Sequence, residues 1–169
     1  MKLFASLALA ALSALPTPTI AETVSSSDTH YVLRHEASST RTAGELWQRL
    51  IRPETWWHPD HTYSGDSGNL SLDARAGGLW LESWDGGSVA HGTVLFVRDG
   101  SVLRMNAPFG PLQALGAHTI WTITISPDGN GSRVVFDEVS NGPPTADMTT
   151  LAEAVDFVKN EAIGRLVGP

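Results

Sequence analysis

Cysteine is absent from the 169 residues, and its absence removes several kinds of site at once. Without thiols the chain cannot form a disulfide, attach haem through a thioether, or bind zinc and iron–sulfur clusters through thiolates. A lipid anchor on an N-terminal cysteine is excluded for the same reason. The fold must therefore be stabilised by its hydrophobic core, and a domain of about 150 residues can bury enough apolar surface for that.

Basic residues and nucleotide-binding motifs are also scarce. Lysine and arginine total 11 against 18 aspartate and glutamate, which gives a formal net charge of −7. An acidic surface repels phosphate backbones and anionic headgroups, so we expect neither nucleic-acid binding nor membrane-surface binding. The sequence has no Gly-x-Ser-x-Gly nucleophile elbow, no phosphate-binding glycine loop and no dinucleotide fingerprint. These absences disfavour covalent catalysis and the use of nucleotides, and no cofactor is predicted.

The N-terminal segment has the pattern of a signal peptide. Lys2 precedes a short apolar run at 3–15, and small residues lead up to Ala21. The run is too short to span a bilayer. We therefore expect cleavage after residue 21, a secreted or periplasmic mature protein, and no membrane insertion once residues 1–21 are removed.

The rest of the chain predicts one domain at 30–169, after a small, polar and flexible segment at 22–29. Alternation and turn signals place its strands at 31–37, 69–73, 79–84, 89–97, 102–107, 118–126 and 133–140. Thr42 and Glu45 form a capping box for a short helix, and Pro53 ends that helix and can begin a second one. The spacing of the later strands is typical of an antiparallel meander.

A long amphipathic helix is predicted at the C-terminus, with Asp147 as its cap. Its apolar residues recur at steps of three and four and share one face, namely Met148, Leu151, Val155, Val158, Ala162 and Leu166. One strand, two short helices, a run of antiparallel strands and this helix make an α+β domain. We expect a monomer or a weak homodimer.

Aromatic and titratable residues gather between residues 56 and 92. This stretch holds four of the six tryptophans and three of the six histidines. Rings that stack beside groups that titrate or hydrogen-bond are typical of a ligand pocket, because a plain core avoids buried polar groups.

The chain resembles the SRPBCC superfamily, whose members are the START-like or Bet v 1-like helix-grip proteins. Within that superfamily it is most similar to the polyketide cyclase/dehydrase-like and heat-shock-ATPase-activator-like branches. The resemblance covers roughly residues 30–167 and rests on 45–47, 53–57, 61–65, 69–73, 77–78 with Glu82, 91–92, 103–104 and 110–113. It implies a curved antiparallel sheet of six to seven strands around a long C-terminal helix, with two short helices after the first strand. It also implies a cavity between sheet and helix for an apolar or aromatic ligand. It implies no single reaction, because transfer proteins, receptors, cyclases and chaperone co-factors share the fold.

Candidate site residues follow from the hairpin turn at 86–87. If the two glycines are its turn residues, Glu82 lies directly opposite His91, within reach of a carboxylate–imidazole hydrogen bond. Continuing the alternation places Arg104 on the same face, together with Trp80. The pattern leaves open whether this face lines the cavity or faces solvent, and the resemblance favours the cavity.

The predicted ligand-binding set is His61, Tyr63, Trp80, Glu82, His91, Arg104 and Phe109. Phe109 belongs to a segment at 107–113 that is rich in proline and glycine. This segment either packs its apolar side chains onto the domain or forms a lid over the cavity.

Histidines 58 and 61 do not by themselves predict a metal site. Pro59 interrupts the helix that would bring their side chains to one face. A zinc site of His61, Glu82 and His91 would have suitable ligands, but no spacing demands it. No metal is therefore predicted.

The function that we expect is binding of a small hydrophobic or aromatic molecule without turnover. The alternative is an enzyme of the cyclase or isomerase type, with Glu82 and His91 as acid and base and Arg104 stabilising an anion. A second alternative is a protein-interaction module. The sequence does not decide whether the protein is an enzyme.

Overall fold

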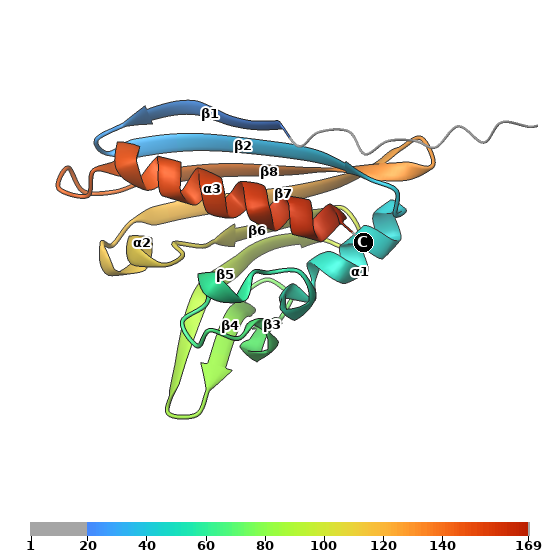
Figure 1. Ribbon diagram of the computed structural model, residues 1–169, viewed down its shortest axis with the longest axis horizontal. Helices are drawn as coiled ribbons and strands as arrows, with labels where there is room; N and C mark the ends of the chain where they lie inside the picture. The colour runs from blue at the N-terminus through green and yellow to red at the C-terminus, as the bar shows by residue number, and fades with distance from the viewer. Residues whose placement is uncertain (1–19, 169) are drawn as a thin grey trace, which may run out of the picture.

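The fold is α+β, with a curved antiparallel sheet of eight strands and one long helix, α3, lying across a face of the sheet (Figure 1). The computed structural model describes residues 20–168. The strand order is β1-β2-β8-β7-β6-β5-β4-β3. The strands are β1 (Ile20–Ser27), β2 (His30–Ser39), β3 (Leu70–Leu72), β4 (Leu79–Trp84), β5 (Gly87–Arg98), β6 (Val102–Asn106), β7 (His118–Asp128) and β8 (Gly131–Asn141). None of the helices within residues 20–168 has the length and hydropathy needed to cross a membrane.

The first strand corrects the sequence prediction at the N-terminus. We expected six to seven strands and a flexible segment at 22–29, but β1 pairs antiparallel with β2 along the sheet edge. Its serine-rich sequence lacks the apolar alternation by which a half-buried strand is recognised, and pairing with β2 requires only its backbone. Of the predicted signal peptide, residues 1–19 lie outside the described residues.

Four short helical elements lie between β2 and β3, and the sequence predicted the first two of them. They are α1 (Ala43–Leu50), η1 (Pro53–Thr55), η2 (Pro59–His61) and η3 (Ser67–Asn69), with α2 (Pro111–Ala114) later in the chain. The capping box of α1 is present, since Thr42 and Glu45 exchange hydrogen bonds between side chain and backbone. Pro53 begins η1 directly after α1.

The long helix α3 (Met148–Val167) provides the layer that packs on the sheet. The carboxylate of Asp147 caps it by accepting the backbone N–H of Thr150, as predicted. Its fully buried residues are Met148, Ala152, Lys159, Ala162, Ile163 and Leu166. Leu151, Val155 and Val158, which belong to the predicted apolar face, are only partly buried. One part of this face therefore packs into the core, and another part lines a cavity that is described below.

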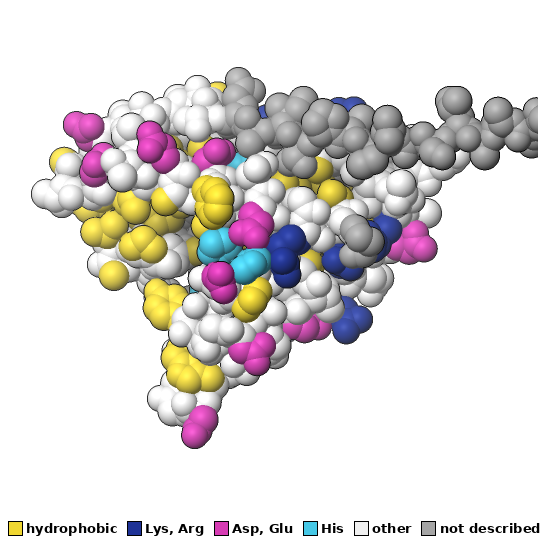
Figure 2. Space-filling model, viewed as in Figure 1, with side chains coloured by type: hydrophobic (Ala, Val, Ile, Leu, Met, Phe, Trp, Pro, Cys, Tyr) yellow, Lys and Arg dark blue, Asp and Glu magenta, His cyan; other side chains and the backbone are white. Residues whose placement is uncertain are grey.

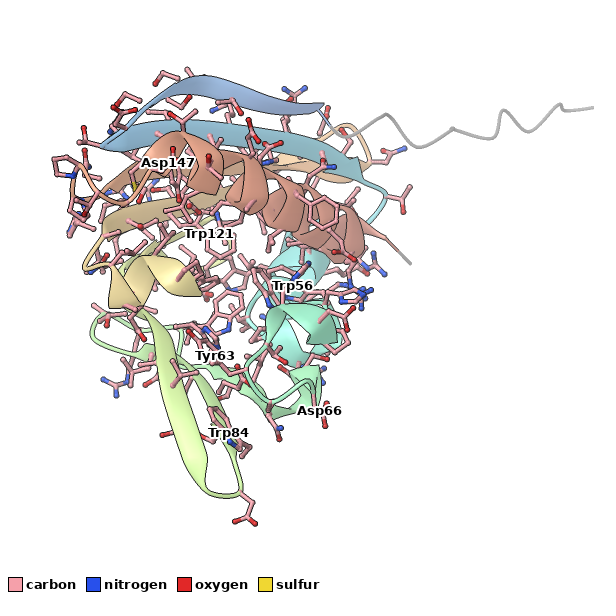
Figure 3. The ribbon with its side chains drawn as sticks, turned by 60° about the vertical axis from the view of Figure 1, so that its left-hand side comes forward. Trp56, Tyr63, Asp66, Trp84, Trp121 and Asp147 are labelled. Carbon is pink, nitrogen blue, oxygen red and sulfur yellow. The ribbon has the colours of Figure 1, made fainter. Side chains whose placement is uncertain are left out.

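The core beneath α3 is built largely from aromatic rings. Trp56, Trp57 and Trp80 meet edge to face at centroid distances of 5.3–5.7 Å. Trp121 of β7 extends this cluster toward the sheet, 5.0 Å from the ring of Phe136. In Figure 3 the labelled Trp121 and Trp56 lie in the interior, between α3 and the turns that follow α1. Such edge-to-face pairs form a rigid wall against which a neighbouring cavity can keep its shape.

Candidate functional site

A cavity of about 560 Å³ lies between α3, the segment that contains α2, and the loop after η2. Its apolar wall contains Trp57, Ala107, Phe109, Pro111, Leu112, Leu151, Ala154, Val155 and Val158. Its polar and titratable members are His61, Thr62, Tyr63, His91, Glu138 and Lys159. A mostly apolar cavity with a few polar groups is the usual form of a small-molecule site.

The cavity wall contains a buried ion pair between α3 and β8. Nζ of Lys159 lies 2.9 Å from Oε2 of Glu138, and both side chains are at most 3% exposed. The other carboxylate oxygen of Glu138 accepts a 2.7 Å hydrogen bond from the hydroxyl of Tyr31 on β2. The ammonium and Oε2 meet as an ion pair but do not have hydrogen-bond geometry, and neither atom hydrogen-bonds to another described residue. Attraction between the two charges therefore holds the pair together.

Aromatic rings supply the rest of the environment of the Lys159 ammonium. Nζ lies 3.0 Å from the ring centroid of Trp121 and 4.8 Å from that of Phe109. A cation over the face of a ring is stabilised by the ring quadrupole. Burial nevertheless lowers the pKa of Lys159 to about 8, and the attraction of Glu138 offsets only part of this effect. Burial and the Glu138 carboxylate together raise the pKa of Tyr31.

The second buried pair is Glu82 with His91, which the sequence predicted to interact. Nε2 of His91 lies 2.7 Å from Oε2 of Glu82, and the side chains are 6% and 0% exposed. Both residues therefore lie on the inner side of the sheet, and His91 lines the cavity. The choice between cavity and solvent that the sequence left open is settled in favour of the interior for these two residues.

The register that produces this pair differs from the predicted one. Glu82 lies opposite Val89, and the turn is formed by residues 85 and 86, since Trp84 pairs with Gly87. His91 is the extra residue of a bulge, because Ala90 pairs with Leu81 whereas Gly92 pairs with Trp80. The prediction that Glu82 faces His91 directly is wrong, and the contact forms diagonally instead.

Glu82 also fixes the loop that closes one side of the cavity. Its two carboxylate oxygens accept the backbone N–H groups of Tyr63 (3.1 Å) and Ser64 (2.6 Å). Burial acts to raise the pKa of Glu82, but the hydrogen bonds from Ser64, Tyr63 and His91 outweigh it and hold the pKa below its ordinary value. An ionised Glu82 therefore accepts the Nε2 proton of His91, which leaves Nδ1 of the imidazole with its lone pair.

Arg104 does not join this site. It pairs with Phe96 and Thr122 on the outer face of the sheet, where its Nε donates a 3.0 Å hydrogen bond to Thr122 Oγ1. The prediction that Arg104 shares a face with Glu82 is wrong because β5 is irregular twice, at His91 and again between Val94 and Phe96. Each irregularity breaks the alternation on which the prediction depended.

The remaining predicted residues lie at different depths. Trp80 is 1% exposed and belongs to the aromatic core, not to the cavity wall. Phe109 lines the cavity and meets Trp57, Trp80 and His91 edge to face at 5.2–5.4 Å. The side chain of Phe109 is therefore packed onto the domain while it also forms part of the cavity wall.

Tyr63 and His61 lie at the rim of the cavity. Tyr63 is 57% exposed, and its hydroxyl donates a long, 3.4 Å hydrogen bond to the carbonyl of Gly110. This contact links the loop after η2 to the segment before α2 across the opening. His61 lines the cavity with its ring and pairs with Glu161 of α3, 2.9 Å from Nε2 to Oε2.

A cluster of metal-ligating side chains forms where η2 meets α3. Among residues 20–168, the only group of three or more such side chains close enough to share an ion is His58, His61 and Glu161. The alternative zinc set of His61, Glu82 and His91 is therefore not assembled. The two histidine rings lie 5.5 Å apart because η2 is a 3-10 turn with Pro59 at its first position, where proline is tolerated. Figure 2 shows histidine and acidic side chains together on this face, next to hydrophobic ones.

Sequence reasoning predicted that the C-terminal helix closes one wall of the cavity, but it missed Lys159 and Glu138 as members of that wall. Both charged residues nevertheless left a signal. Lys159 lies four residues after Val155 and three before Ala162, a position of the helix that should be apolar. Glu138 alternates with Phe136 in β8 on the face that packs inward. A charge at an inward position of each element indicates a buried pair.

Solved structures share this fold, although no family model and no curated protein matches the chain. A Rhodobacter sphaeroides protein matches with a TM-score of 0.57 and 18% identity, over 88% of this chain and 96% of that chain. A conserved protein of unknown function from Enterococcus faecalis has a TM-score of 0.56 and 10% identity, over 82% and 72%. CalU16 from Micromonospora echinospora has a TM-score of 0.53 and 12% identity, over 90% and 88%. At these identities the likeness establishes an antiparallel sheet with a C-terminal helix, consistent with a helix-grip fold.

We expect the protein to lose stability as the pH falls below about 6.5. Burial lowers the pKa of His35 and of His91, despite the neighbouring carboxylates of Asp156 and Glu82. Both imidazoles are neutral in the folded state, so the unfolded chain takes up protons first. Their contribution to stability is complete above about pH 6.5 and is lost as the pH falls toward the lowered values. Urea unfolding at several pH values between about 7.5 and 5.5 measures this slope.

His91→Gln serves as the control for this pH dependence, because its amide can still donate a hydrogen bond to Glu82. The variant should unfold with a smaller dependence on pH in the same range. A slope that stays unchanged in the variant would show that His91 does not contribute.

Proposed function

We propose that this protein binds one small hydrophobic or aromatic molecule in the cavity between the sheet and α3. The observation that carries the proposal is the cavity of about 560 Å³, whose wall is formed mainly by aromatic and aliphatic side chains. Burial of the ligand's apolar surface would supply the affinity, at about 25 cal/mol per Å². The polar groups at the rim and in the wall, among them Tyr63 and His91, would orient it.

The proposal includes membership of the START-like helix-grip superfamily that the sequence resembles. The sheet-and-helix fold supports this assignment, as do the solved structures that share it. In this arrangement the ligand lies against α3, which contributes Leu151, Val155 and Val158 to the wall. The binding residues that we propose are accordingly His61, Tyr63, His91 and Phe109, together with this side of α3.

The test is saturable binding of a fluorescent apolar probe, 1-anilinonaphthalene-8-sulfonate, to the native protein. We expect one site per chain, and a rise in melting temperature as the probe concentration increases. Val155→Phe adds volume inside the cavity and should abolish most of the binding. Val139→Phe makes the same change on the outer face of β8, where Val139 is 38% exposed, and should leave the binding unchanged.

Two results would contradict the proposal. One is the absence of saturable binding with this probe and with a panel of aromatic and acyl compounds screened by native mass spectrometry. The other is equal binding by Val155→Phe and Val139→Phe, since the probe would then occupy some other surface.

An enzyme of the cyclase or isomerase type is the second candidate function. The observation that favours it is the placement of His91 in the cavity wall, with Nε2 fixed by Glu82 and the lone pair of Nδ1 free to act as a base. Arg104 has no part in this candidate, because it lies on the outer face of the sheet. Turnover of a captured ligand would separate this function from binding alone.

A further inference from the structure

The side chains of His58, His61 and Glu161 converge beside the cavity. Nε2 of His61 lies 2.9 Å from Oε2 of Glu161, and Nε2 of His58 lies 3.5 Å from Oε1. The three ligand atoms all lie within 4.8 Å of one another, and each side chain is only 21–32% exposed. Two neutral imidazoles and one carboxylate form a ligand set that zinc commonly uses when it keeps a further position open.

The backbone around this cluster is held in place by its own hydrogen bonds. Arg165 of α3 donates from Nε to the carbonyl of Trp56 (2.9 Å), and Trp57 donates from Nε1 to the carbonyl of His61 (3.0 Å). The first bond fixes the start of the turn that carries the histidines against the helix that carries Glu161, and the second closes the turn on itself. The ligand atoms are therefore brought together by the fold, as a metal site requires.

We propose that His58, His61 and Glu161 bind a divalent transition-metal ion, with Zn²⁺ as the best match to the ligand types. Bonds of 2.0–2.1 Å in a tetrahedral arrangement place ligand atoms about 3.3 Å apart. The two nitrogens lie 2.9 Å from Oε2 and 3.5 Å from Oε1 of the same carboxylate, distances on either side of that value, and the three ligand atoms lie within 4.8 Å of one another. Small side-chain rotations on a fixed backbone can therefore complete the geometry.

Metal binding requires a proton rearrangement at His58. Nδ1 of His58 accepts the backbone N–H of Asp60 (3.1 Å), so in the neutral ring the proton is on Nε2. Coordination through Nε2 moves that proton to Nδ1 and displaces this hydrogen bond. The carboxylate of Asp60, with Oδ2 at 3.9 Å from Nδ1, can then accept the proton as an outer partner of the ligand.

The position of the cluster gives the ion a role at the cavity. His61 belongs both to the cluster and to the cavity wall, so a bound ion lies at the rim of the cavity. Three protein ligands leave a fourth position for water or for an oxygen or nitrogen atom of a bound molecule. The site therefore favours ligands that carry one such donor on an apolar body.

The test is titration of untagged, chelator-treated protein with ZnCl₂ by isothermal calorimetry at neutral pH, and with CoCl₂ by visible absorption. We expect one ion per chain, intense Co²⁺ absorption typical of four-coordination, and a rise in melting temperature that EDTA reverses.

Matched variants identify the ligands. Glu161→Gln and His61→Asn should each weaken Zn²⁺ binding by at least about tenfold. Glu153→Gln, on the exposed side of the same helix, and His118→Asn, on β7, should bind as the unmodified protein does. No saturable binding, or equal losses in all four variants, would overturn the proposal. Because the titration contains no organic ligand, its outcome is independent of whether the cavity binds an apolar molecule.

Discussion

Replacing Lys159 by methionine should lower the free energy of unfolding by about 3–5 kcal/mol. The ammonium is buried, 2.9 Å from Glu138, and its removal leaves a carboxylate in the interior with only the hydroxyl of Tyr31 as a partner. The cost of that unpaired charge exceeds the gain from burying a thioether of similar size against Trp121. Urea unfolding of the variant and of the unmodified protein at pH 7 measures the difference.

The double variant Lys159→Met/Glu138→Gln should recover most of the lost stability. Glutamine removes the uncompensated charge, while its amide oxygen can still accept the Tyr31 hydrogen bond. A cycle of the two single variants and the double variant then gives the coupling energy of the pair. A Lys159→Met variant as stable as the unmodified protein would contradict the interpretation, because it would mean that Glu138 needs no counter-ion.

The pH dependence provides a second measurement of the same pair. The folded-state pKa of Lys159 is about 8, whereas an unfolded lysine has a pKa of about 10.4. Between these values the unfolded chain holds the extra proton, so stability should rise as the pH increases from about 8. Lys159→Met should not show this rise. The raised pKa of Tyr31 sets the upper limit of the window, because above about pH 10 the unfolded chain loses its tyrosine proton first.

The fold followed from the sequence wherever a local pattern was repeated often enough. The apolar steps of α3, the capping box of Thr42 and Glu45, and the turn signals between the later strands predicted the α+β arrangement that the structure has. The edge strand β1 was missed because a strand that buries little of its side chains needs no apolar alternation.

The candidate site was predictable only in part, because single residues change the register of a sheet. Gly86 and Gly87 were taken as the two turn residues, but they have separate roles. Gly86 has a φ of 84° and belongs to the turn, whereas Gly87 leaves room for the ring of Trp84. A Cβ at Gly87 would lie 2.6 Å from Cζ2 of that ring. A pair of glycines does not indicate which of them turns the chain and which one makes space.

Contacts between distant segments were beyond sequence reasoning for a different reason. His58 and Glu161 are brought together by the packing of a turn on a helix about a hundred residues later in the chain. The same holds for Lys159 with Glu138. Helical and strand periodicity report which face of an element is buried, but they do not report which element it meets. A contact between distant elements can still be suspected where a residue breaks the periodicity of an element. A charged residue at a position that should be buried is the strongest such indication.

Ending the chain after Pro144 should abolish cooperative folding. The truncation removes α3, which covers one face of the sheet with Met148, Ala152, Ala162, Ile163 and Leu166, all at most 3% exposed. The aromatic and aliphatic side chains beneath it would become a contiguous apolar surface larger than a soluble monomer tolerates. We expect aggregation and the loss of a thermal transition, measured by circular dichroism and light scattering. A chain that ends after Gly168 keeps α3 and is the control.

A point variant shows whether packing by α3, and not merely chain length, is responsible. Ile163→Asp places a charge where the side chain is fully buried and should cost about 3–5 kcal/mol. Asn160→Asp introduces the same side chain at an exposed position of the same helix and should change the stability by less than about 0.5 kcal/mol. If the truncated chain still melted cooperatively near the temperature of the full-length protein, the sheet would be stable without its helix. Because α3 also forms one wall of the cavity, we expect the stability of the fold and the formation of the cavity to depend on the same helix.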